Sequence, residues 1–122
     1  MSDGPVEQNV RPEYEIGVRD ALAASSKGTL TILDIREHEE LAVVKLDTAE
    51  HIPASEFAAR VDEIMDLADA SGPEGLALMC HVGVRSFQAT MLLRQEGVEN
   101  VRSLAGGIDA WSVYIDPDLP RY

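Results

Sequence analysis

The sequence is poor in cysteine: Cys80 is its only one in 122 residues. A single thiol cannot form an internal disulfide, which suits a reducing compartment, and it excludes a multi-cysteine zinc site. His38, His51 and His81 show no ligand spacing and lie near different predicted elements, so we expect no metal. Gly106-Gly107 lacks the spacing of a dinucleotide-binding loop.

Long apolar runs and positive charge are also scarce. No stretch approaches the roughly 20 apolar residues of a membrane helix, and Met1 to Arg11 lacks the apolar centre of a signal peptide. We therefore expect a cytoplasmic protein. The formal net charge of −12 argues against nucleic acid or an anionic membrane as main partner, because both need a basic face. Solubility alone is a sufficient explanation of the acidity.

The pattern along the chain predicts one α/β domain over residues 13–122, preceded by a loose tail over 1–12. Strands are predicted at 30–35, 41–46, 76–79 and 101–104. Helices are predicted at 18–25, about 56–68 with Ser55 as cap, 87–96, and after Gly106-Gly107, where the last carries Trp111 and Tyr114. This alternation implies a parallel sheet covered on both faces, with ligands beyond the carboxyl ends of its strands.

Cys80 stands at such a strand end and begins the loop Cys80-His81-Val82-Gly83-Val84-Arg85-Ser86. The loop can direct successive backbone N–H groups inward, and these would favour the thiolate form of Cys80. Gly83 allows an unusual backbone conformation, Arg85 adds positive charge, and Ser86 suits a helix N-cap. A free cysteine is commonly buried and inert, but this combination favours a nucleophile. Whether His81 contacts substrate or solvent stays open.

Four segments in order resemble signatures of the rhodanese family, and the likeness extends from about residue 29 to 122. They are Leu33-Asp34-Ile35-Arg36-Glu37, His51-Ile52-Pro53-Ala54, the loop from Cys80 to Ser86, and Leu104-Ala105-Gly106-Gly107 with Trp111. The resemblance implies a three-layer fold with a five-stranded parallel sheet in the order 1-5-4-2-3.

The resemblance also assigns roles to residues. It implies that Cys80 becomes a persulfide and that the loop amides from His81 to Arg85 hold the outer sulfur. Its substrate-binding residues would be His81, Val82, Gly83, Val84, Arg85 and Ser86. Asp34 and Arg36 would be structural supports, although from the residues alone a surface ion pair is as good an explanation.

The implied activity is that of a sulfurtransferase of the thiosulfate sulfurtransferase class, without a cofactor. Its donor would be thiosulfate or a protein persulfide, and its acceptor cyanide, a thiol or a sulfur carrier. The run from Asp116 to Tyr122 resembles the end of rhodanese domains fused to E1-like activating enzymes. A ubiquitin-like carrier or an activating enzyme would then bind in trans.

Two alternatives have different chemistry. Phosphatases and arsenate reductases share the fold, but the phosphatase loop holds five residues between cysteine and arginine, whereas this chain has the four from His81 to Val84. A non-catalytic rhodanese-like binding module is the other alternative, and such modules often lack the cysteine. The physiological donor and acceptor and the oligomeric state do not follow from the sequence.

Overall fold

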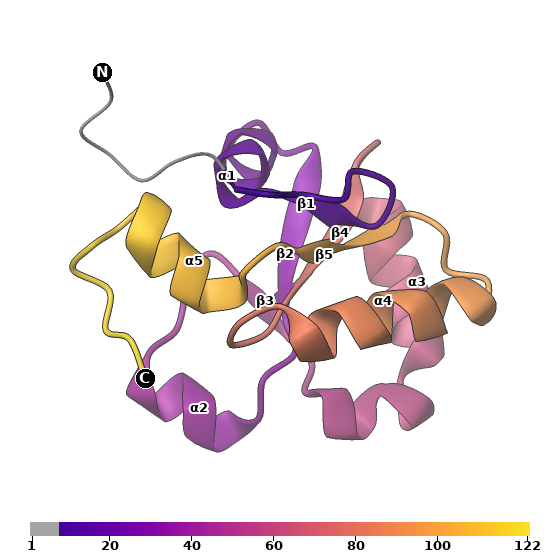
Figure 1. Ribbon diagram of the computed structural model, residues 1–122. Helices are drawn as coiled ribbons and strands as arrows, with labels where there is room; N and C mark the ends of the chain where they lie inside the picture. The colour runs from indigo at the N-terminus through magenta and orange to yellow at the C-terminus, as the bar shows by residue number, and fades with distance from the viewer. Residues whose placement is uncertain (1–7) are drawn as a thin grey trace.

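A single parallel sheet organises the chain, in a computed structural model that describes residues 8–122 (Figure 1). The strands are β1 (Glu15–Ile16), β2 (Leu30–Asp34), β3 (Glu50–His51), β4 (Gly75–Met79) and β5 (Val101–Leu104). Their order is β1-β5-β4-β2-β3, and every neighbouring pair is parallel. The predicted α/β fold and strand order are confirmed.

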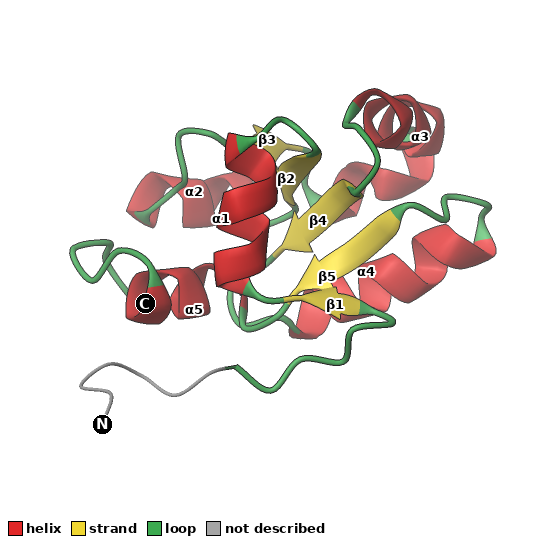
Figure 2. Ribbon diagram, turned by 90° about the horizontal axis from the view of Figure 1, so that it is seen from above, coloured by secondary structure: helices red, strands yellow, loops and turns green. Residues whose placement is uncertain are grey.

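Helices cover both faces of the sheet (Figure 2). They are α1 (Val18–Ser26), α2 (His38–Val43), α3 (Val61–Ala70), α4 (Val84–Gln95), α5 (Gly107–Tyr114) and a short 3-10 helix, η1 (Ala54–Ala59). One apolar core forms between the sheet and α1 with α5, and a second forms between the sheet, η1, α3 and α4. Every residue of β4 is buried, which explains why its sequence is continuously apolar.

The register of β2 and β4 positions the cysteine loop. Asp34, the last residue of β2, pairs with Met79, the last residue of β4. Arg36 and Cys80 therefore leave the sheet at the same edge, the carboxyl end of the two central strands. This is the edge where ligands bind in parallel α/β sheets.

The predicted strand over 41–46 is wrong, because its first half belongs to helix α2. A capping box holds the start of this helix: Glu37 and Glu40 each accept a hydrogen bond from the other's backbone N–H. Glu39 and Glu40 in the first turn also suit the positive end of the helix dipole. These local interactions outweigh the strand propensity of Val43 and Val44. The edge strand β3 forms several residues later.

Two predicted helix starts are also wrong. The segment after Pro53 forms η1, breaks at Arg60 and continues as α3, so Ser55 caps no α-helix. Its hydroxyl instead donates to Glu37 Oε1 at 2.7 Å. Helix α4 begins at Val84 with Gly83 at its N-cap, three residues before the predicted start.

Residues 1–7 of the predicted tail lie outside the described part of the chain. Within the remainder, Gln8 donates to Ala105 O and accepts from the Val18 N–H, both at 2.8 Å. Between residues 8 and 122, no helix combines the length and the apolar character that crossing a bilayer demands.

Candidate active site

The Cys80 thiol lies inside its own loop, surrounded by hydrogen-bonding groups. Its Sγ accepts from the backbone N–H of Gly83 at 3.1 Å and of Ser86 at 3.3 Å. The thiol lies 3.3 Å from Ser86 Oγ, which in turn lies 2.7 Å from Ser103 Oγ. The residue is 1% exposed and belongs to the apolar core formed with η1, α3 and α4, but two backbone N–H groups are turned toward its sulfur. Such groups stabilise negative charge on sulfur.

Gly83 makes the turn that directs these groups inward. Its φ of +99° lies in the left-handed region, and a Cβ there would come within 3.0 Å of the Gly106 nitrogen. Because α4 starts directly after Gly83, Ser86 lies in the first helical turn and the prediction of an N-cap at Ser86 is wrong. Its buried hydroxyl bonds to Cys80 and Ser103 instead.

Several loop amides remain free for a further group. Within residues 8–122, no acceptor is found for the backbone N–H groups of His81, Val82, Val84 and Arg85. The binding of an outer sulfur by these amides, which the resemblance implies, stays a prediction. Val82 and Val84 are 50% and 60% exposed and flank a hollow of about 280 Å³ beside the loop.

Helix α5 holds the base of the loop. The Ile108 N–H donates to Cys80 O at 2.9 Å, and the Asp109 N–H donates to His81 O at 3.0 Å. The turn predicted at Gly106-Gly107 is confirmed. Its second function, anchoring the cysteine loop through the first amides of α5, was not predicted.

Asp34 and Arg36 form a buried pair rather than a surface one. Arg36 is 0% exposed, and its Nη2 donates to Asp34 Oδ2 at 2.7 Å and to Val44 O at 2.8 Å. The Arg36 backbone N–H also donates to Asp34 Oδ1 at 3.0 Å. The pair thus fixes the chain that leaves β2 beside the cysteine loop.

Arg85 makes a bidentate ion pair with Glu40 of α2. Its Nη1 and Nη2 donate to the two carboxylate oxygens at 2.8 Å and 2.7 Å. The Tyr122 hydroxyl donates to Glu40 Oε1 at 2.9 Å and accepts from Arg36 Nη1 at 3.1 Å. The Tyr122 ring stacks on His81, with centroids 3.8 Å apart and planes 7° apart. His81 therefore contacts the end of the described chain.

These contacts shift the ionisation of the groups involved. The Arg85 hydrogen bonds, together with the Glu37 N–H and the Tyr122 hydroxyl, lower the pKa of Glu40 to about 2. Glu40 in turn raises the pKa of Arg85. Burial is the largest cause of the raised pKa of Tyr122. Glu40 and Arg85 are accordingly both charged at neutral pH.

This lowered pKa predicts a pH-dependent contribution to stability. An ionised Glu40 stabilises the fold above its ordinary pKa of 4.5, and the stabilisation is lost as the pH falls from 4.5 toward 2. Glu40→Gln should therefore lower the urea midpoint of unfolding more at pH 6 than at pH 3. Equal losses at the two pH values would show that the charge of Glu40 contributes nothing.

Sequence reasoning missed Glu40, Ser103 and Tyr122 as neighbours of the loop. A signal existed for Glu40: the Glu37/Glu40 spacing of three is that of a capping box and indicates a helix start. Ser103 follows from the register of β5 beside β4, where it pairs with Leu78. For Tyr122, no local pattern predicts the contact.

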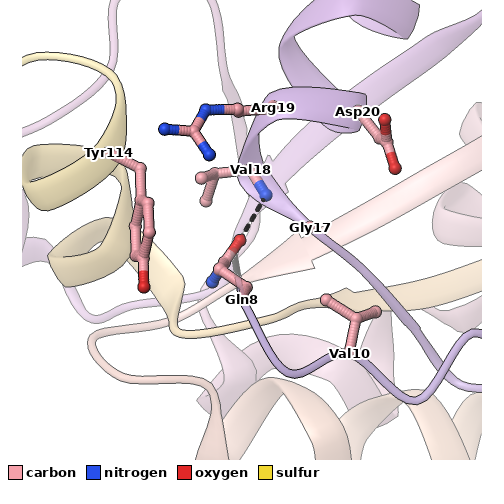
Figure 3. A pocket seen from close by; sticks show the side chains of 7 residues that line it. All are labelled: Gln8, Val10, Gly17, Val18, Arg19, Asp20 and Tyr114. Carbon is pink, nitrogen blue, oxygen red and sulfur yellow. Dashed lines mark hydrogen bonds between the residues drawn. The ribbon is translucent and has the colours of Figure 1, made fainter. Parts of the chain in front are cut away.

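A separate small pocket of about 90 Å³ lies at the start of α1 (Figure 3). Gln8 crosses it to bond the Val18 N–H, and Arg19 extends toward Tyr114 (Figure 3). No residue of the cysteine loop lines this pocket. Among residues 8–122, no group of three or more His, Cys, Asp or Glu side chains is arranged to hold a metal ion.

A parallel α/β domain in which a cysteine beyond a central strand accepts backbone N–H groups from its own loop is typical of a known class of protein. The family model described as "Rhodanese-like domain" matches residues 18–113. The chain belongs to this family, and the predicted resemblance is confirmed.

The relatives include large enzymes and single domains. The adenylyltransferase and sulfurtransferase MOCS3-2 of Zea mays is 29% identical over 92 residues, which are 75% of this chain and 19% of that protein. The probable adenylyltransferase/sulfurtransferase MoeZ of Mycobacterium tuberculosis is 31% identical over 105 residues, 86% of this chain and 25% of that protein. The chain thus spans about a fifth to a quarter of these relatives.

A solved structure of similar size is also related. The human single-domain sulfurtransferase TSTD1 superposes with a TM-score of 0.66 at 28% identity, covering 80% of this chain and 93% of that one. The reduced Bacillus anthracis CoADR-RHD gives a TM-score of 0.70 at 19% identity, covering 87% of this chain and 18% of that one, and shows the shared fold alone.

Proposed function

We propose that the protein is a sulfurtransferase that carries a sulfane sulfur as a persulfide on Cys80. The observation that supports this most directly is the position of Sγ, which accepts two backbone N–H groups at 3.1 and 3.3 Å beyond the end of β4. The free amides of His81, Val82, Val84 and Arg85 would hold the outer sulfur. Sulfurtransferases among the relatives support the same chemistry.

The proposed reaction has two displacement steps. The Cys80 thiolate attacks the sulfane sulfur of a donor, and the donor's remaining part leaves with the bonding electrons, as sulfite from thiosulfate or as a thiolate from a persulfide. An acceptor nucleophile, which is cyanide, a small thiol or a thiol on a sulfur carrier, then attacks the outer sulfur and Cys80 leaves as thiolate. Preorganised N–H groups stabilise the negative sulfur in both steps, which is commonly a large catalytic effect.

Other parts of the site would serve this reaction indirectly. We assign Asp34 and Arg36 the role of positioning residues, since they fix the segment between β2 and α2 beside the loop. Because Cys80 is 1% exposed, a donor reaches Sγ when loop side chains move aside. The adenylyltransferase/sulfurtransferase relatives suggest a ubiquitin-like carrier or an activating enzyme as partner in trans. The single unpaired thiol suits a reducing compartment such as the cytoplasm.

Intact-mass measurement tests the proposal directly. Wild-type protein and Cys80→Ser are incubated with thiosulfate, with cysteamine persulfide, or with a cysteine desulfurase and cysteine. We expect wild type to gain the mass of one sulfur atom and to return to its starting mass when cyanide is added. Cys80→Ser, with a hydroxyl in place of the thiol, should gain nothing.

Two results would contradict the proposal. Hydrolysis of an aryl phosphate by wild type without any sulfur gain would favour the phosphatase chemistry. If wild type and Cys80→Ser both bind a ubiquitin-like carrier or an activating enzyme, and neither gains sulfur or hydrolyses the phosphate, the protein is a binding module.

A further inference from the structure

We propose that Glu40 determines the choice of sulfur donor, by neutralising Arg85 and so disfavouring dianionic thiosulfate relative to a persulfide of no net charge. This inference rests on the proposed function. It identifies the donor class as a persulfide on a carrier that supplies its own positive charge, and it makes Glu40 a positioning residue that acts through Arg85.

Arg85 is the one arginine within the cysteine loop, five residues after Cys80 and one before Ser86, whose N–H donates to Sγ. A thiosulfate sulfonate approaching the loop would need such a cation, because it carries negative charge beyond the sulfur that is transferred. Both terminal nitrogens of Arg85 instead donate to Glu40, at 2.8 and 2.7 Å. The guanidinium therefore presents little net charge to a donor.

Glu40 is held so firmly that the pair differs from a mobile surface ion pair. Its Oε1 accepts from Arg85 Nη2 and from the Tyr122 hydroxyl, and its Oε2 accepts from Arg85 Nη1 and from the Glu37 N–H at 3.0 Å. Four hydrogen bonds from three residues fix both oxygens. Exposed pairs commonly open because two long side chains lose conformational entropy, whereas three other hydrogen bonds still hold this carboxylate when one is broken.

Other arginines near the loop are matched by carboxylates in the same way. Arg11, which lines the hollow beside Val82, pairs with Glu15 at 3.0 Å. Arg36 is buried against Asp34, and Arg121 pairs with Asp109 of α5 at 2.8 Å. None of these pairs leaves a net positive charge beside the site. With a formal net charge of −12 over the whole chain, the long-range field also repels dianions.

A persulfide on an amine-bearing carrier avoids this repulsion. In cysteamine persulfide, the ammonium balances the negative terminal sulfur. The Cys80 thiolate attacks that terminal sulfur, the sulfur–sulfur bond breaks, and cysteamine leaves as its thiolate and takes up a proton. With thiosulfate, the same attack releases sulfite, and the dianion must first enter a site that offers it no free cation.

The experiment compares two donors on four proteins. The rate at which Cys80 gains sulfur is measured by intact mass over a range of concentrations of thiosulfate and of cysteamine persulfide. The proteins are wild type, Glu40→Gln, the double variant Glu40→Gln/Arg85→Gln, and the control Glu63→Gln. Glu63 also pairs with an arginine, Arg60 at 2.7 Å, but on the exposed side of α3. Both second-order rate constants are measured on the same preparation, so their ratio does not depend on the fraction of active protein.

Glu40→Gln frees the charge of Arg85 while keeping the shape of the side chain. We expect the second-order rate constant with thiosulfate, divided by that with cysteamine persulfide, to rise roughly tenfold, which is the size of effect that one uncompensated charge has on a charged substrate. The rise should appear in the thiosulfate concentration dependence, not in the rate at saturation. The double variant should return to the wild-type ratio, and Glu63→Gln should not change it.

Salt dependence gives a second test that needs no substitution. Loading of wild type by thiosulfate should rise or stay level as ionic strength increases, whereas loading of Glu40→Gln should fall, because salt screens attraction by a free cation.

An unchanged donor ratio in Glu40→Gln, or wild-type loading that falls steeply with salt, would overturn the role of Glu40 while leaving the persulfide on Cys80 intact. If neither donor loads any variant, the proposed function itself is wrong.

Discussion

Arg36→Met is expected to lower the free energy of unfolding by about 3–5 kcal/mol, the usual cost of removing one partner of a buried ion pair. Arg36 is 0% exposed and Asp34 is buried with it. The substitution leaves the Asp34 carboxylate without its two side-chain donors, and it leaves Val44 O without the Arg36 Nη2 donor. Such a loss is a large share of the 5–15 kcal/mol by which a domain is typically stable.

Urea denaturation of matched variants measures this effect. Arg60→Met removes an arginine that pairs with Glu56 and Glu63 at the surface, and it should lower the urea midpoint of unfolding far less than Arg36→Met does. Adding Asp34→Asn to Arg36→Met should recover part of the loss, because the uncompensated charge is then gone. Equal losses for Arg36→Met and Arg60→Met would show that the buried pair adds no more than a surface pair.

Local pattern was enough to predict most of the fold. The apolar runs that became β2, β4 and β5 are buried along nearly their whole length, so their composition reports their environment directly. Helices α1 and α5 begin where the glycines and the apolar spacing indicated. The position of Cys80 follows from the same reasoning, since a reactive residue at the end of a buried strand emerges where loops meet.

The failures share a physical cause, which is competition between local preferences. Around α2, Val43 and Val44 favour a strand, whereas Glu37, Glu39 and Glu40 at its start favour a helix, and the capping box decides the outcome. At Ser86, a good capping residue lies three positions after Gly83, whose left-handed backbone starts the helix first. Propensity alone does not rank such signals, because each contributes a similar small free energy.

The partners of the loop were beyond prediction for a different reason. Glu40 meets Arg85 across 45 positions of sequence, and Tyr122 meets Glu40 across 82. These contacts depend on how α2 and the end of the chain lie over the edge of the sheet, and neither segment is buried enough for an apolar pattern to show its position. Donor preference, if Glu40 controls it, is therefore encoded outside the cysteine loop.

Gly107→Ala should reduce sulfur loading of Cys80 roughly a hundredfold, which is the effect of displacing a reactive group by about 1 Å. Gly107 has φ +60°, and a Cβ there would collide with the carbonyl oxygens of Cys80 and His81, the second at 2.5 Å. Those two oxygens accept the Ile108 and Asp109 N–H groups that anchor the loop. Backbone atoms cannot rotate aside as a flexible side chain can, so the loop itself has to move.

Gly28→Ala separates this displacement from backbone strain. Gly28 has a similar φ of +77°, but a Cβ there meets nothing within 4 Å. Gly28→Ala should cost about 1–2 kcal/mol in urea denaturation, for placing alanine in the left-handed region. Gly107→Ala should cost more than Gly28→Ala, because the collision with the two carbonyls adds to that strain. Sulfur loading of both variants is compared at a temperature where both are folded. If loading falls in Gly107→Ala and not in Gly28→Ala, the carbonyls of Cys80 and His81 must keep their positions for the loop amides to reach the sulfur. Equal loading by the two variants would instead mean that the amide ring around Sγ forms independently of α5, and that Gly83 and the first turn of α4 are sufficient to hold it.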